Sequence, residues 1–364
     1  MSPTNTILGG RVGKENVAKR SQTSALGVND LAFNIVEYMA AASVHSLAIA
    51  LVVEAMLRIW HLQPPRQRLA FRLLVLVLPL AALPLFRVLW PVQQSLPFKQ
   101  QFALLDVSSW LEIGLWRGLA LWHLVAGALG ITTVLFLVQE VMPTLQHHLF
   151  NRNCHIPIVK GQLPKLDRAL DRLARSSSHP LPPVHFCQQE QPTAYACGLL
   201  HHSLVVSPSL VEVLDEEELE ACLAHELAHL KHRDNWTGWL FLALRAAQFY
   251  NPVAMLVARH MLQDNERACD ERAASLAGKP LALASSLVKV FRETEAQVTP
   301  SGPPGWRGWV SSRVTALEDH ARLAATESRV TRIMQPLPSV AVPYLGLRFG
   351  LCLVAMLALQ ALIL

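Results

Sequence analysis

Charged residues are scarce in this chain of 364 amino acids. They make up 16% of the sequence, whereas apolar residues reach 52%. An ordinary soluble protein has about a quarter of its residues charged. The formal net charge of +5 is modest, and no dense run of lysine and arginine with interleaved aromatic residues occurs, so nucleic acid is not expected as a partner. The composition favours a membrane protein with room for about two domains.

Cysteine patterns that would indicate a structural metal motif are also missing. None of the six cysteines forms a CxxC pair, so the spacing favours neither a zinc knuckle nor a disulfide scaffold. Unpaired cysteines fit a reducing compartment. Residues 1–30 lack the short apolar core of a secretory signal peptide, and their polar composition predicts a flexible N-terminal tail.

Four apolar runs have about the length of a membrane-spanning helix, which needs roughly 20 residues. They are residues 31–53, 69–89, 115–138 and 342–364. Buried core helices are the alternative explanation, and Glu37 makes the first run the least secure. We expect three transmembrane helices with their loops in residues 31–149 and a fourth helix in residues 341–364.

Lysines and arginines in short flanks set the orientation of membrane helices, because the side with more of them faces the cytoplasm. The loop after the first run and the flank after the third run carry most of these residues. They are Arg58, Arg66, Arg68, Arg152, Lys160 and Lys165. These two flanks lie on the same side, so we expect the central region in the cytoplasm and the N-terminus outside.

The central region, residues 150–340, has mixed charge and frequent turn residues. Its pattern predicts a short amphipathic helix at Leu166–Ala174 and a small sheet. The predicted strands are Leu181–Gln189, Pro192–Gly198 and His202–Leu210. Asp215 and Glu218 have the spacing of a capping box at the start of a longer helix.

The motif HELAH, which runs from His225 to His229, is the strongest signal of chemistry. On a helix its two histidines lie at positions i and i+4, share one face and can bind one metal ion. Glu226 lies beside that face, where it can accept a proton from an attacking water. A charged, solvated helix face is the alternative. The surrounding apolar residues favour the metal, because a buried polar cluster without a partner is costly.

A third ligand is required for a catalytic metal. The metzincin pattern fails, because it needs Gly and His where this chain has His232 and Asn235. Glu266 and Asp270 lie at i and i+4 on a later predicted helix. Glu266 can complete a His2Glu site of the kind that holds catalytic zinc, and Asp270 can orient a ligand histidine. A surface helix of mixed charge is the alternative for this pair alone. The expected cofactor is one Zn²⁺ per chain.

Residues 236–262 connect the two motifs and are mostly apolar. The stretch before Asn251 is too short to span a bilayer, and Pro252 interrupts the run. We expect two helices that rest against the bilayer, with a re-entrant or spanning hairpin as the alternative.

These residues resemble the BlaR/MecR-type membrane zinc metallopeptidases, which are gluzincins, and the related HtpX and CAAX prenyl protease group. The resemblance covers about 183–273 and also 327–333, and its most specific motifs are LAHELAHLKHRDN and QDNERACDERA. It implies three spans, a cytoplasmic zinc domain and a further span, in the inner (plasma) membrane of a bacterium. The sensors of this family continue into an extracellular penicillin-binding domain, which this chain lacks after residue 364, so direct β-lactam sensing is not expected.

The resemblance also implies roles for matching positions. The matching metal ligands are His225, His229 and Glu266, with Glu226 as general base and Asp270 as the carboxylate behind the ligands. The edge strand that holds an extended substrate matches Ala194, Tyr195, Ala196 and Cys197. The family steadies the oxyanion with a His, Tyr or Arg, and the candidates here are His320 first, then His202 and Arg272.

We therefore predict an α+β fold: a polytopic membrane protein with about four transmembrane helices and a mainly helical, zincin-like metalloprotease domain that has a small sheet. The predicted function is a zinc-dependent endopeptidase for protein or peptide substrates near the lipid bilayer, in regulation by repressor cleavage or in quality control. The alternative is a non-catalytic membrane signalling or scaffold protein with a structural or vestigial zinc site. A transporter is a third possibility, which only Glu37 and His45 favour.

Overall fold

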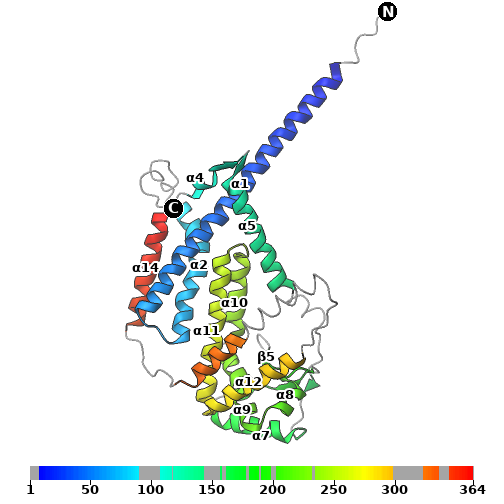
Figure 1. Cartoon of the computed structure of the whole chain (residues 1–364), viewed down its shortest axis with the longest axis vertical. Helices are drawn as coiled ribbons and strands as arrows, with labels where there is room; N and C mark the ends of the chain where they lie inside the picture. The colour runs from blue at the N-terminus through cyan, green and yellow to red at the C-terminus, as the bar shows by residue number, and fades with distance from the viewer. Residues whose placement is uncertain are drawn as a thin grey trace, which may run out of the picture.

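The computed structural model describes residues 8–89, 107–116, 118–142, 156–157, 161–177, 180–187, 190–197, 202–231, 234–297, 323–335 and 344–363. Long helices form one end of the molecule, and shorter helices with a small sheet form the other (Figure 1). The predicted α+β class is confirmed in this coarse form.

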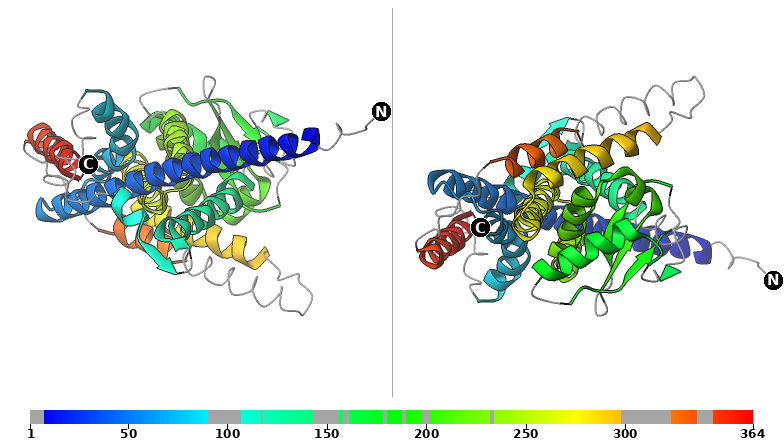
Figure 2. Two further views of the ribbon diagram at one scale, coloured as in Figure 1. Left: turned by 90° about the horizontal axis from the view of Figure 1, so that it is seen from above. Right: turned by 90° about the horizontal axis from the view of Figure 1, so that it is seen from below.

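Four helices coincide with the apolar runs of the sequence. They are α1 (Leu8–Ile59), α2 (Pro65–Leu89), α5 (Leu121–Phe136) and α14 (Leu345–Ile363). A short helix, α4 (Val107–Leu111), precedes α5. Figure 2 shows α14 at the edge of this helical group, next to α1 and α2.

The backbone differs from the sequence-based expectation in two places. Helix α1 begins at Leu8, so residues 8–30, which we expected to form a flexible tail, continue the first apolar helix; no proline interrupts this stretch of sequence. The start of the third run is a hairpin of β1 (Gly114–Trp116) and β2 (Leu119–Ala120). Gly118 takes a φ of 86° at its turn, a conformation that favours glycine.

The described residues contain one helical segment that is long and apolar enough to cross a membrane. It is Asp30–Ile59, with 30 residues and a mean hydropathy of 1.8. The apolar helices Leu121–Phe136 and Leu345–Leu359 are shorter, and α2 contains Pro79 and Pro84. The expectation of about four spans is thus supported at one of them and stays a prediction at the other three.

A hairpin of two helices follows the first predicted metal motif, and its second helix carries the other motif. Helix α10 (Asp234–Ala247) turns into α11 (Pro252–Ala277), as expected from the break at this point. The side chain of Asn251 caps α11 by accepting hydrogen bonds from two backbone N–H groups of its first turn. Pro252 at the first position has no N–H that would need a partner.

Helix α11 is common to both ends of the molecule. Its first half packs with α1, α2, α10 and α14 through side chains that include Val257, Ala258 and Met261. Its second half contributes Ala273 and Ala274 to the core of the other end. A single continuous helix therefore connects the long helices with the region that holds the predicted site.

The small sheet has the strand order β3-β4-β6-β5. Its strands are β3 (Ile156–Pro157), β4 (Val184–Phe186), β5 (Ala194–Cys197) and β6 (Ser203–Val206). Strand β4 runs parallel to β6, and the other pairs are antiparallel. Each predicted strand segment contains an observed strand, but the end of the third, Pro208–Leu210, belongs to helix α8 (Pro208–Val213) instead. Strand β5 lies at the edge of the sheet.

Helices α7 (Pro164–Ser176), α8 (Pro208–Val213), α9 (Glu216–Lys231) and α12 (Pro280–Gln297) pack around one apolar core with the sheet. A further helix covers residues 323–333. The predicted capping box of α9 is confirmed: Asp215 N–H donates to Glu218 over 2.8 Å, and Glu218 N–H donates to Asp215 over 2.8 Å.

Candidate metal centre

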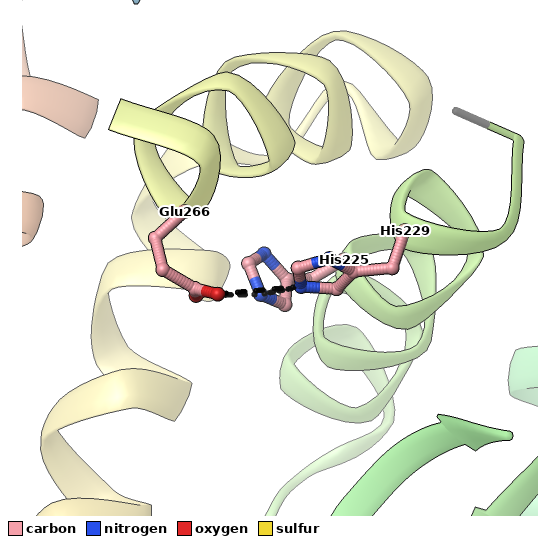
Figure 3. A group of neighbouring side chains, drawn as sticks. All are labelled: His225, His229 and Glu266. Atoms are coloured by element: carbon pink, nitrogen blue, oxygen red, sulfur yellow. Dashed lines mark hydrogen bonds and ion pairs between the residues drawn. The ribbon is translucent and has the colours of Figure 1, made fainter. Parts of the chain in front are cut away.

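Two histidines of α9 face one glutamate of α11 (Figure 3). The Nε2 atoms of His225 and His229 lie 3.2 Å apart. Glu266 places Oε2 at 3.5 Å from His225 Nε2 and Oε1 at 3.7 Å from His229 Nε2. The helical spacing explains the first relationship, because residues i and i+4 lie one above the other on the same face. Packing of α11 against α9 supplies the second.

These three side chains fit a divalent metal ion. Their donor atoms all lie within 4.8 Å of one another. Tetrahedral zinc with bonds of about 2.0–2.1 Å would hold its ligand atoms about 3.3 Å apart, close to the distances between these donors. Two imidazole nitrogens and one carboxylate oxygen are also a donor set that zinc accepts in catalytic sites.

The site favours a positive charge between its carboxylates. Burial opposes protonation of His225, but the carboxylates of Asp270 and Glu266 outweigh it and raise its pKa to about 10. The pKa of Glu266 is lowered even though burial raises it, since His225, Arg329 and His229 favour the carboxylate form. The negative electrostatic potential of these carboxylates therefore favours a cation at this position.

Both ligand histidines have a partner at their other ring nitrogen. Nδ1 of His225 lies 3.0 Å from Oδ1 of Asp270. Nδ1 of His229 lies 3.4 Å from the sulfur of the buried Cys269. Such contacts fix the orientation and tautomer of a metal-binding imidazole. Asp270 thus occupies the place predicted for it, and the contact of Cys269 was not foreseen.

Arg329, which is not among the site residues that the sequence predicts, completes this arrangement. Its Nε and Nη2 atoms each donate to Asp270 over 2.7 Å, and its Nη1 lies 3.4 Å from Glu266 Oε2. Burial raises the pKa of Asp270, but Arg329 and His225 outweigh it and lower that pKa to about 2. The family resemblance at residues 327–333 is the signal in the sequence that points to this segment.

Glu226 lines the same cleft as His225, His229 and Glu266, and it contacts the edge strand. Its Oε2 accepts a hydrogen bond of 3.1 Å from Ala196 N–H. Burial raises the pKa of this carboxyl group, while His225 and His229 lower it by a smaller amount. A raised pKa suits a group that must take up and release a proton near neutral pH.

The cleft has a volume of about 700 Å³ and an apolar wall. Helix α12 supplies much of this wall with Leu283, Leu287, Val290 and Phe291, and Ala194 of β5 also lines the cleft. Ala196 N–H points at α9, so this edge of β5 faces the cleft. An extended peptide could therefore pair with β5 and reach the metal site.

The structure does not place any of the three predicted oxyanion residues in the described lining of the cleft. His320 lies outside the described residues. His202 and Arg272 are not among the described residues that line the cleft, whereas Arg329 is. The structure therefore brings Arg329, rather than either of these two, to the reacting region.

Comparison with known proteins is consistent with this geometry. Residues 181–291 match the family model described as BlaR1 peptidase M56. The matched segment includes both histidines, Glu226, Glu266 and Asp270.

Curated relatives of the chain are proteases. A "Protease HtpX homolog" of Salinibacter ruber is 31% identical over 171 residues, which covers 40% of this chain and 62% of the relative. One of Acidiphilium cryptum is 32% identical over 167 residues, which covers 37% of this chain and 58% of the relative. The chain thus spans about three fifths of these relatives. The predicted relationship to BlaR/MecR-type and HtpX-type membrane metallopeptidases is confirmed.

A solved structure also resembles the chain. It is the crystal structure of Ste24p of S. mikatae, which matches with a TM-score of 0.33 and 16% sequence identity, over 84% of this chain and 90% of that one.

Proposed function

We propose that this protein is a membrane zinc endopeptidase that uses His225, His229 and Glu266 to hold the metal. The observation that carries the proposal is the convergence of these donors, within 4.8 Å of one another, in a cleft that Glu226 also lines. The relationship to HtpX-type proteases supports the same activity.

Zinc at these ligands would supply a Lewis acid and lower the pKa of an attacking water from about 15.7 to near 7. Glu226 accepts the proton of that water and passes it to the leaving amine, because its carboxylate lies in the cleft and has a raised pKa. Arg329 holds Asp270 against His225 and is our candidate for stabilising the oxyanion.

Protein or peptide segments in an extended conformation are the proposed substrates. The edge of β5 that faces Glu226 supports this class, because an added strand would place its backbone along the cleft. The apolar wall from α12 suits apolar side chains of the substrate. A role in regulation by repressor cleavage or in quality control is part of the proposal.

A location in the inner membrane of a bacterium, with the zinc centre on the cytoplasmic side, is also proposed. The α10–α11 hairpin supports contact with the bilayer, because two amide side chains near its turn are buried while several of its leucines are exposed. Gln248 and Asn251 are fully buried, whereas Leu240, Leu256 and Leu262 are exposed. This is the reverse of the pattern on a water-exposed hairpin.

The decisive experiment uses the purified full chain in lipid nanodiscs. We expect about one zinc ion per chain and cleavage of unfolded protein substrates that stops on treatment with a chelator and returns with zinc. A chain that binds zinc tightly but cleaves no member of a diverse peptide library would contradict the proposal. That result would favour the scaffold alternative, in which the metal has a structural role.

A further inference from the structure

A buried ion pair connects the long helices with α11 just before Glu266. Nη1 of Arg72 on α2 lies 2.5 Å from Oδ2 of Asp264 on α11, and their side chains are 5% and 0% exposed. Arg72 also donates from Nε to Glu54 of α1 over 2.7 Å. One guanidinium group therefore joins three helices at a single point.

Burying this ion pair costs free energy, so its presence suggests a role in geometry rather than in stability. Removing two charges from water carries a large desolvation penalty, and well-packed apolar residues often stabilise a fold as well or better. The neighbouring contacts between α2 and α11 are apolar, through residues such as Val75 and Met261. The ion pair restricts the relative orientation of α2 and α11, because a guanidinium group binds a carboxylate in a defined geometry.

Asp264 and Glu266 lie on roughly opposite sides of α11. Successive residues of an α-helix are rotated by about 100°, so two positions apart corresponds to about 200°. Asp264 faces α2, and Glu266 faces the histidines of α9. Rotation of α11 about its axis would move both carboxylates together, so that a fixed Asp264 also fixes the direction in which Glu266 points.

A second contact extends the link toward the other side of the metal centre. Arg267 Nη1 lies 3.4 Å from the remaining oxygen of Asp264, and its Nη2 donates to Ser328 over 3.2 Å. Ser328 is adjacent to Arg329, which holds Asp270 behind His225. The buried carboxylate of Asp264 is thus in contact with α2 on one side. On the other side it is linked through Arg267 to the segment that carries Arg329.

We infer that Arg72 is a positioning residue for the metal centre: its ion pair with Asp264 sets the rotation of α11 and so directs Glu266 toward His225 and His229. The inference rests on the proposed function, in which Glu266 is a metal ligand. It makes the geometry of the centre depend on the position of α2.

The test is a metal titration of the full chain in nanodiscs with Co²⁺, whose visible spectrum reports its ligands, and with Zn²⁺ against a chelator. The variants are Arg72→Met and Asp264→Asn. We expect each to weaken metal binding by at least about tenfold, the range found when groups that orient metal ligands are lost, and to change the Co²⁺ spectrum. Lys289→Met is the matched control, because it removes an ion pair with the buried Glu218 at the far end of α9.

The thermal unfolding of the metal-free protein separates positioning from general stability. If Arg72→Met does not fold, Arg72→Lys replaces it: lysine keeps the charge but cannot bridge both carboxylates in the same geometry, so we expect a smaller loss of metal affinity. Folded variants with reduced melting temperature but metal affinity within twofold of the unsubstituted protein would overturn the inference. Failure of the unsubstituted protein to bind either metal would overturn the proposed function and this inference with it.

Discussion

Arg329 binds Asp270 through two parallel hydrogen bonds, with Nε and Nη2 each 2.7 Å from a carboxylate oxygen. The same carboxylate lies 3.0 Å from Nδ1 of His225. A helix at residues 323–333 therefore supports a histidine of α9 through a residue of α11. Three segments that are distant in the sequence determine how one imidazole is oriented.

Replacing Arg329 by methionine removes this support. We expect metal affinity to fall by about 10- to 100-fold, since loss of groups behind metal ligands has effects of that size. Arg329→Lys should recover only part of the affinity, because an ammonium group cannot make the two-point contact. The measurement is a zinc titration in the presence of a competing chelator. Arg332→Met is the control on the same helix, because Arg332 pairs with Glu271 instead; equal losses in both variants would contradict the role of Arg329.

Glu226→Gln separates metal binding from catalysis. The amide keeps the shape of the side chain but cannot accept the proton, so cleavage should fall by about 10²- to 10⁴-fold while zinc content stays the same. The measurement is peptide cleavage alongside metal analysis of the purified variant. Glu217→Gln, which changes an exposed carboxylate of the same helix, should cleave normally. Proteolysis by Glu226→Gln at the normal rate would refute the assignment of the base.

Glu266→Gln tests the third ligand. The amide is a poorer ligand and lacks the charge, so metal affinity should fall by at least about 100-fold, the upper range for groups behind the ligands. The Co²⁺ spectrum of the variant should also change. Glu271→Gln, on the same helix, is the control, since Glu271 pairs with Arg332 and does not face the histidines. Unchanged binding in Glu266→Gln would leave the centre without its proposed third ligand.

The capping residue Glu218 predicts a pH dependence of stability. Burial raises its pKa, but hydrogen bonds from Lys289, Ser285 and Asp215 N–H to the carboxylate outweigh burial and lower the pKa overall. A lowered folded-state pKa stabilises the protein above the unfolded value of about 4.3, and this contribution disappears as the pH falls through the folded-state pKa.

Glu218→Gln should therefore destabilise the protein by about 1–2 kcal/mol at pH 7, and the difference from the unsubstituted protein should shrink below about pH 4. Thermal or denaturant unfolding at several pH values measures it. Glu217→Gln should show little effect at any pH, because the Glu217 side chain is 65% exposed. A difference that grows toward acid pH would show that the sign of this pKa argument is wrong.

Contact of the α10–α11 hairpin with lipid can be tested by photocrosslinking. A benzophenone amino acid in place of Leu256, an exposed apolar residue of α11, should crosslink to lipid in nanodiscs. The same group in place of Glu212, on the exposed surface of α8, should not. A lack of lipid adducts at position 256, with crosslinks only to soluble protein, would exclude a lipid-facing hairpin.

The candidate metal centre was predictable because its residues follow helical spacing within each of two helices. HExxH places two histidines on one face of α9, and Glu266 and Asp270 follow at helical spacing on α11. Arg329 was not predictable in the same way, since it reaches Asp270 from 59 positions along the chain. A pattern of residues does not tell where a distant helix folds back.

Arg72 shows a second limit of sequence reasoning. In the sequence it lies within the apolar run of residues 69–89, close to one end. In the structure it is buried and bound to Glu54 and Asp264. Hydropathy records the cost of a charge in an apolar helix but does not identify the partners that offset it. The hairpin at residues 114–120 escaped for a related reason: its apolar residues continue the run, while its turn depends on the backbone of Gly118.

The open edge of β5 has a consequence for timing. A strand can join this edge only if several consecutive residues of the incoming chain have released their own backbone hydrogen bonds. Under the proposed function, the rate at which a folded target is cut is then limited by how often that target opens locally, which its own stability sets. A target protein can thus remain intact next to the cleft. It is cut only after a ligand, a modification or damage makes the target unfold locally more often.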